Sequence, residues 1–146
     1  MTTTFLRSTL AAATCAVAVA LAGPAFAAMV NLKAELSGKA EVPANDSKAT
    51  GSVTATFDTD SKKLTWKGSY SGLSGPATAA HFHTGEAGKN GGVAVPIFAG
   101  AAAKSPFEGS ATLTDVQAAD LLAGKLYANI HTEANKAGEI RGQLTK

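Results

Sequence analysis

The chain has 146 residues, of which 13 are basic and 11 are acidic. This length suits one domain with its own core. The charges nearly balance and form no basic block or stripe that could neutralise phosphates, which argues against nucleic acid or an anionic membrane as a partner. The only cysteine, Cys15, excludes a disulfide within the chain, so the core must be stabilised by packing.

The N-terminus has the layout of a secretory signal peptide. Arg7 is its only charged residue, Leu10–Leu21 is mostly apolar, and Ala25–Ala27 offers a cleavage site of small residues. The apolar run is shorter than the roughly 20 residues of a membrane-spanning helix. We therefore expect residues 1–27 to be removed, leaving a soluble domain over residues 28–146 that is periplasmic or secreted.

Short segments of alternating polarity follow, and this alternation is typical of strands. Phe57 and Trp66 are expected in the core, and a turn over residues 58–61 predicts a hairpin. Pro96 favours an edge or a bulge because it lacks an amide hydrogen. The predicted strands cover residues 30–36, 53–57, 64–70, 77–83, 93–98, 107–113, 126–131 and 139–144.

One short helix is predicted between the last strands. Thr114 and Gln117 match a capping box, and Gly124 is a typical terminator, which gives a helix over Asp115–Ala123. Seven or so strands with turns about every ten residues, joined by one crossover helix, predict the all-β class and an antiparallel Greek-key β-sandwich.

All three histidines lie in two segments, Ala79–Gly85 and Tyr127–Thr132. His81 and His83 share one face of a strand about 6.7 Å apart, and His131 also points away from the apolar side. If the two strands are neighbours, three imidazoles can bind one metal ion. The alternative is that each histidine is a surface or hydrogen-bonded residue without a ligand.

Two further features flank these segments. Residues 84–92 contain four glycines and predict a surface loop beside the histidines, since they lack the order of a phosphate-binding loop. Glu139 and Arg141 share a face of the last strand and predict an exposed ion pair, with Glu41 as the alternative partner of Arg141.

Several motifs in order resemble the CHRD domain, the module named after chordin and often found alone in exported bacterial proteins. The resemblance spans nearly all of the mature chain, with Ala44 standing where the family often has a second proline. The matching segments are Glu41-Val42-Pro43, Gly72-Leu73, Ala79–Gly85 with Ala87-Gly88, and Leu126–Thr132 continuing to Gly138–Leu144.

The resemblance implies a sandwich similar to immunoglobulin-like or copper/zinc superoxide dismutase-like domains. The His81 to His83 stretch resembles the copper-binding strand of that dismutase, with His131 in the place of a later copper ligand. No histidine remains for a bridged zinc site, so any metal site would be mononuclear. Bacterial members mostly lack an assigned activity, whereas chordin binds growth factors.

The leading hypothesis is an exported copper-binding protein with His81, His83 and His131 as ligands, with zinc as the alternative metal. Water, Glu86 or Glu133 would supply a fourth ligand, and Asn129 an outer partner.

Two alternatives remain. One is a metal-free module that binds a protein partner. The other is a copper-only dismutase-like enzyme in which Arg141 steers an anion. The protein partner and the oligomeric state are left open by the sequence.

Overall fold

The computed structural model of the chain describes residues 28–100 and 103–146, so the predicted signal peptide lies outside the described part. The described part confirms the all-β class with one short helix. Its elements are β1 (Met29–Ser37), the 3-10 helix η1 (Gly38–Ala40), β2 (Thr50–Asp58), β3 (Lys63–Ser71), β4 (Ala77–Thr84), β5 (Val93–Ala99), β6 (Phe107–Thr112), α1 (Asp115–Leu122), β7 (Leu126–Thr132) and β8 (Ile140–Gln143).

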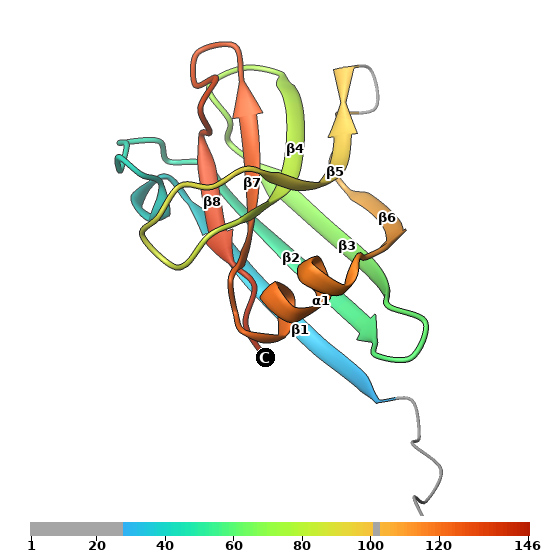
Figure 1. Cartoon of the computed structure of the whole chain (residues 1–146). Coiled ribbons are helices and arrows are strands. Elements are labelled where there is room, and N and C mark those ends of the chain that lie inside the picture. Colours follow the sequence, from blue (N-terminus) through green and yellow to red (C-terminus); the bar gives the residue numbers. More distant parts are fainter. Residues whose placement is uncertain (1–27, 101–102) are drawn as a thin grey trace, which may run out of the picture.

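The eight strands form one sheet in the order β5-β4-β7-β8-β1-β2-β3-β6, and each neighbouring pair is antiparallel. The predicted hairpin is confirmed, since β2 and β3 pair along their whole length. The last two strands enter the middle of the sheet, between β4 and β1 (Figure 1). This order places β7 directly beside β4, although the two are far apart in the sequence.

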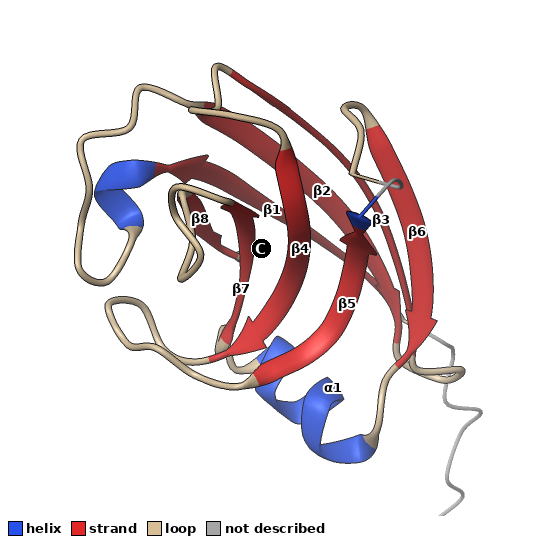
Figure 2. Ribbon diagram, turned by 90° about the horizontal axis from the view of Figure 1, so that it is seen from above, coloured by secondary structure: helices blue, strands red, loops and turns tan. Residues whose placement is uncertain are grey.

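The sheet curls so that one half, β5-β4-β7-β8, faces the other half, β1-β2-β3-β6 (Figure 2). Apolar side chains from both halves fill the space between them. Trp66 of β3 meets Phe82 of β4 edge to face, with ring centroids 5.2 Å apart, and Phe98 of β5 meets Phe107 of β6 at 5.2 Å. Phe57 and Trp66 are core residues, as predicted.

The strand β5 ends the sheet on one side, and it contains Pro96. Pro96 pairs with His81 between two register shifts along β4. Both expectations for this proline, an edge strand and an irregular register, are confirmed. The irregularity lies in the strand that carries His81 and His83.

The helix α1 connects β6 to β7 and forms the predicted capping box. Thr114 Oγ1 accepts a hydrogen bond from the Gln117 amide, and Gln117 Oε1 accepts one from the Thr114 amide. Gly124 follows the helix with φ +71°, a conformation that favours glycine. Neither of the described helices is long and apolar enough to cross a membrane.

The outer face of β7 is covered, which the alternation of polarity did not predict. All seven residues of β7 are buried, including the polar ones that point away from the core. The loop 85–92, which leaves β4, crosses β7 and β8 before it reaches β5 (Figure 1). The three histidines therefore lie between the sheet and its loops.

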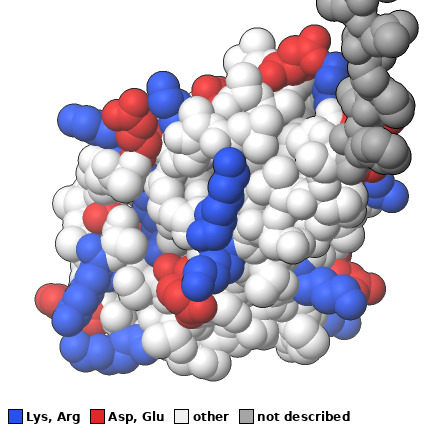
Figure 3. All heavy atoms as spheres, turned by 90° about the horizontal axis from the view of Figure 1, so that it is seen from below, with Lys and Arg blue, Asp and Glu red and all other residues white. Residues whose placement is uncertain are grey.

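On the face shown in Figure 3, side chains of both signs lie next to each other in separate small groups between wide uncharged areas. Exposed ion pairs of this kind contribute about 0–1 kcal/mol each, so the fold does not depend on them. The pairs among the described residues are Lys62 with Asp115, Lys67 with Glu108, Lys125 with Glu86, and Lys136 with Glu133.

We expect Thr114→Ala to lower the free energy of unfolding by about 1 kcal/mol, because the Gln117 amide loses its cap. Thr114→Ser keeps the hydroxyl and should match the wild type. Urea unfolding followed by the fluorescence of Trp66, the only tryptophan of the chain, measures both. Equal stability of the alanine variant and the wild type would contradict a role for this cap.

Candidate metal centre

The register between β4 and β7 brings the three histidines together, as predicted. His81 pairs with Asn129, His83 with Tyr127, and Ala79 with His131. Directly paired residues project from the same face of a sheet. The imidazoles of His81, His83 and His131 consequently converge on the face opposite the core.

The three rings are close enough to share one ion. Their centroids are 5.4 Å apart for His81 and His83, 5.0 Å for His81 and His131, and 5.8 Å for His83 and His131. One nitrogen from each ring can be chosen so that all three lie within 4.8 Å of one another. His81 Nδ1 and His131 Nε2 lie 3.1 Å apart and share a hydrogen bond.

Main-chain carbonyls fix which nitrogen of two rings carries the hydrogen. His83 Nδ1 lies 3.1 Å from the Gly91 carbonyl oxygen, and His131 Nδ1 lies 3.0 Å from that of Lys136. A carbonyl only accepts, so each Nδ1 must donate, and in the neutral ring each Nε2 keeps its lone pair. His83 Nε2 is buried and has no hydrogen-bond partner among the described residues.

Burial lowers the pKa of all three imidazoles below the ordinary value and is the largest cause in each case. The bonds to the Gly91 and Lys136 carbonyls oppose this shift without cancelling it. Neighbouring positive charge adds to it, from His83 on His81, from Arg141 on His83, and from the other two imidazoles on His131. The rings are therefore neutral at pH 7, the state in which imidazole binds metals.

The predicted glycine-rich loop does lie beside the histidines, and Gly91 shows why a side chain is excluded there. A Cβ at this position would be 1.4 Å from the Thr84 carbonyl oxygen. The close approach lets the Gly91 carbonyl reach His83. Tyr127 contacts both Gly91 and His83: its hydroxyl accepts a hydrogen bond from the Gly91 amide at 3.2 Å, and its ring stacks on His83.

The predicted ion pair between Glu139 and Arg141 is wrong. Both residues are buried, with 0% and 2% of their surface exposed, and the ion pairs among the described residues include neither. Glu41 makes no ion pair with Arg141 either. The loops that cover this face of β8 supply neutral partners, and the guanidinium is therefore not free to steer an anion to the site.

The Glu139 carboxylate accepts five hydrogen bonds. Oε1 receives the Ser47 hydroxyl and the Ser74 amide, both at 2.8 Å, while Oε2 receives Ser74 Oγ at 2.6 Å, Thr132 Oγ1 at 2.7 Å and Asn135 Nδ2 at 3.2 Å. Burial raises the pKa of Glu139, but the hydrogen bonds from Ser74, Thr132 and Ser47 outweigh it and hold the pKa at about 2. This buried carboxylate is ionised at neutral pH.

Asn129, the expected outer partner of the ligands, instead contacts a second buried carboxyl group. Its Nδ2 donates to both oxygens of Glu41, at 2.9 and 3.1 Å. Burial raises the pKa of Glu41 to about 7, although Arg141 and the Asn129 hydrogen bond lower it. No hydrogen bond joins Asn129 to a histidine in the described part of the chain.

Neither carboxylate proposed as a fourth ligand joins the cluster. The Glu86 carboxylate lies 3.5 Å from Lys125 Nζ, and that of Glu133 lies 2.7 Å from Lys136 Nζ. Both are exposed, and the group of residues that could hold a metal contains only histidines in the part of the chain that the structure describes. A fourth ligand from these two residues is therefore excluded in this arrangement.

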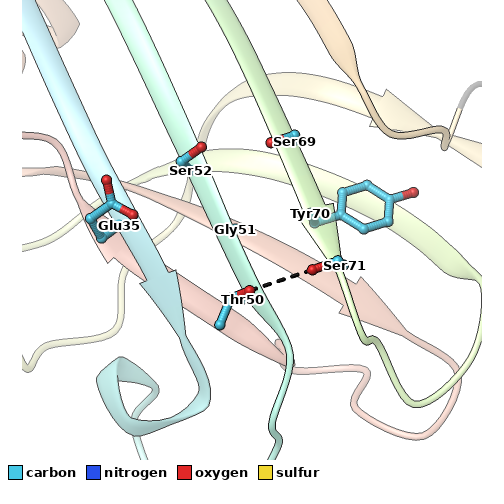
Figure 4. A pocket seen from close by; sticks show the side chains of 7 residues that line it. All are labelled: Glu35, Thr50, Gly51, Ser52, Ser69, Tyr70 and Ser71. Atoms are coloured by element: carbon cyan, nitrogen blue, oxygen red, sulfur yellow. Dashed lines mark hydrogen bonds between the residues drawn. The ribbon is translucent and has the colours of Figure 1, made fainter.

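A separate hollow lies on the outer face of β1, β2 and β3 (Figure 4). Thr50 and Ser71 share a hydrogen bond of 3.5 Å across it, and the Tyr70 ring turns away to pack near Phe98. No histidine lines this hollow, so it is not part of the candidate metal centre. Its lining residues are Glu35, Thr50, Gly51, Ser52, Ser69, Tyr70 and Ser71.

Fold and site together define an all-β domain with three converging histidines. The family model of the CHRD domain matches residues 32–144, which is more than half of the chain and includes all three histidines. The chain therefore belongs to the CHRD domain family, as its motifs predicted. No curated protein matches the chain, and no solved structure does.

The groups that hold the histidines were missed by sequence reasoning. The carbonyls of Gly91 and Lys136 belong to loops, and a main-chain carbonyl leaves no signal in a sequence. Tyr127 does leave one, because it shares its strand face with His131. The same parity could have placed it beside His83.

In the metal-free protein we expect all three imidazoles to titrate below about pH 6.5. Because the unfolded chain then binds more protons than the folded one, the free energy of unfolding should fall as pH drops through about 6.5. NMR titration of the imidazole resonances measures the three midpoints. A midpoint at or above the ordinary value would contradict burial of neutral rings.

Glu139→Gln should remove an acid-dependent part of the stability. The wild-type carboxyl has a pKa of about 2 when folded and an ordinary value of 4.5, so it stabilises the fold above pH 4.5 and loses this effect as pH falls toward 2. The difference corresponds to roughly 3 kcal/mol at pH 7. Urea unfolding between pH 7 and pH 2.5 should show the two proteins converging in acid, whereas parallel curves would contradict the expectation. Glu133→Gln, an exposed matched change, should leave the curve unaltered.

Proposed function

We propose that this CHRD domain is an exported copper-binding protein with a mononuclear site formed by His81, His83 and His131. The observation that carries the proposal is the lone pair of His83 Nε2, which is buried beside two other imidazoles and has no partner among the described residues. A buried polar atom without a partner is costly. A bound cation would satisfy it.

The spacing of the closest nitrogens fits a shared ion. Metal–nitrogen bonds of about 2.0 Å place adjacent ligand atoms about 2.8 Å apart at a right angle and about 3.3 Å apart at the tetrahedral angle. The 3.1 Å between His81 Nδ1 and His131 Nε2 lies between these values. His83 and His131 would bind through Nε2 and His81 through Nδ1. In the metal-free protein His81 Nδ1 donates to His131 Nε2, so its hydrogen would move to Nε2 when the ion binds.

The donor set favours copper over zinc. Imidazole nitrogen suits both Cu(II) and Zn(II), and a given site generally binds Cu(II) more tightly. Zinc remains the alternative metal. No histidine, cysteine or carboxylate beyond the three histidines joins the cluster in the described residues, so the fourth position is left to water.

The predicted signal peptide supports a periplasmic or secreted location for the site, and copper handling there is the role we propose. An open coordination position is also what a redox catalyst requires. Arg141 is nevertheless turned into the protein and cannot guide an anion to the metal. Binding without catalysis is therefore the function that the geometry supports best.

We expect the exported protein, purified without added metal, to take up about one Cu(II) per chain with nitrogen hyperfine structure in its EPR spectrum. His81→Ala, His83→Ala and His131→Ala should each weaken binding by more than about 100-fold, beyond the cost of losing an outer partner. Elemental analysis and Cu(II) titration measure stoichiometry and affinity. Thr78→Ala changes an exposed residue of the same strand and should bind like the wild type.

Unchanged copper affinity in His81→Ala and His83→Ala would contradict the proposal. So would the absence of saturable binding in the wild type, and the histidines would then be framework residues of a protein-binding module. If the protein binds one zinc per chain and Cu(II) does not displace it, the three-histidine site is confirmed but its metal is zinc.

A further inference from the structure

Two loop carbonyls orient the histidine cluster, and they belong to different loops. The Gly91 carbonyl lies in the loop 85–92 and accepts from His83, while the Lys136 carbonyl lies in the loop 133–138 and accepts from His131. Loop segments are generally more mobile than the strands that they connect. Each carbonyl can fix a ring only if its own loop is held in place.

Arg141 holds the loop 85–92 through three hydrogen bonds. Its Nη2 donates to the carbonyls of Glu86 and Lys89, at 3.2 and 2.6 Å, and its Nη1 donates to Asn90 Oδ1 at 3.1 Å. All three acceptors stand shortly before Gly91 in the same loop. A planar guanidinium suits such a fan of acceptors because its donors point in fixed directions.

Tyr127 gives Arg141 a second connection to His83. The guanidinium carbon lies 3.4 Å from the centroid of the Tyr127 ring, and this ring stacks on His83 at 5.1 Å with an interplanar angle of 8°. Since β7 lies between β4 and β8, the tyrosine ring stands between the histidine and the arginine. Arg141 therefore acts on His83 through the loop and through this ring.

Glu139 holds the second loop in the same way. Its Oε2 accepts from Thr132 Oγ1 and from Asn135 Nδ2, and Asn135 directly precedes Lys136. The Asn135 amide also donates to Thr132 Oγ1 at 3.2 Å. The carboxylate thus fixes Thr132, where this loop starts, and Asn135, which precedes Lys136. The Lys136 carbonyl accepts the hydrogen bond from His131.

We infer that Glu139 and Arg141 are positioning residues of the histidine cluster, each holding the loop whose carbonyl sets the tautomer of one ligand. Burying two ions that do not pair with each other costs free energy of desolvation. Apolar side chains of similar volume often stabilise a fold equally well without this cost. The three hydrogen bonds of Arg141 all go to the loop that it holds, and two of the five of Glu139 go to Thr132 and Asn135, at the start of and within its loop. The part of this inference that concerns metal affinity rests on the proposed copper site.

The test is made first on the metal-free protein. Long-range ¹H–¹⁵N NMR of the imidazoles distinguishes a ring with hydrogen on Nδ1 from one with hydrogen on Nε2. In the wild type, both His83 and His131 should carry it on Nδ1. Any other tautomer in the folded wild type would overturn the inference without use of a variant.

Two conservative substitutions then separate the loops. Arg141→Lys keeps the charge but cannot reach three acceptors, so His83 should become a mixture of tautomers while His131 is unchanged. Glu139→Gln should affect His131 and spare His83. Lys125→Gln, beside the first loop, and Glu133→Gln, at the start of the second, alter exposed charges and should change neither ring.

The crossed pattern is the readout that a merely structural role would not produce. Unchanged tautomers in both folded variants, or equal changes at both histidines in each variant, would overturn the inference. Titration with Cu(II) then measures affinity, and each variant should bind about 10-fold more weakly, the lower end of the cost of an altered outer partner. If each variant changes the tautomer of its own histidine alone but the wild type binds no copper, the proposed function is wrong and the positioning role of Glu139 and Arg141 is confirmed.

Discussion

The antiparallel register between β4 and β7 is the constraint on which the histidine cluster depends. It sets His81 opposite Asn129 and leaves His131 on the same face, while Phe82 and Ile130 enter the core. A slip of one residue would send every side chain of one strand to the other face. Because both strands bury their apolar side completely, the packing of the core also fixes the meeting of the three imidazoles.

The loops over β7 and β8 add a second constraint, since they turn the outer face of a sheet into an interior. Buried ions cost several kcal/mol each unless their hydrogen bonds are satisfied. Glu139 and Arg141 are two positions apart, yet they share no partner: Arg141 donates only within the loop 85–92, whereas Glu139 accepts from Ser47, Ser74, Thr132 and Asn135. The carboxylate holds the loop whose carbonyl accepts from His131, and the guanidinium holds the loop whose carbonyl accepts from His83. Two buried side chains of opposite charge therefore hold the loops around the histidine cluster.

Most of the scaffold could be predicted from the sequence, because alternation reports which face of a strand meets the core. Thr114 and Gln117 indicated the helix start, the spacing of His81 and His83 indicated two of the three candidate ligands, and strand parity indicated His131. The glycine-rich loop could also be placed beside the histidines, but the contacts of the loops could not be predicted, since no periodic pattern reports them. Glu139 and Arg141 show the error that follows, because residues that share an exposed strand face are normally expected to pair.

We propose that one copper ion binds between three imidazoles, two of which, His83 and His131, have their free nitrogen fixed by main-chain carbonyls. Crystals of the copper-loaded protein, measured at the copper absorption edge, test it most directly. We expect one anomalous peak about 2.0 Å from Nδ1 of His81 and from Nε2 of His83 and His131. A copper peak at another place on the protein, or copper bound through other nitrogens of these rings, would contradict it.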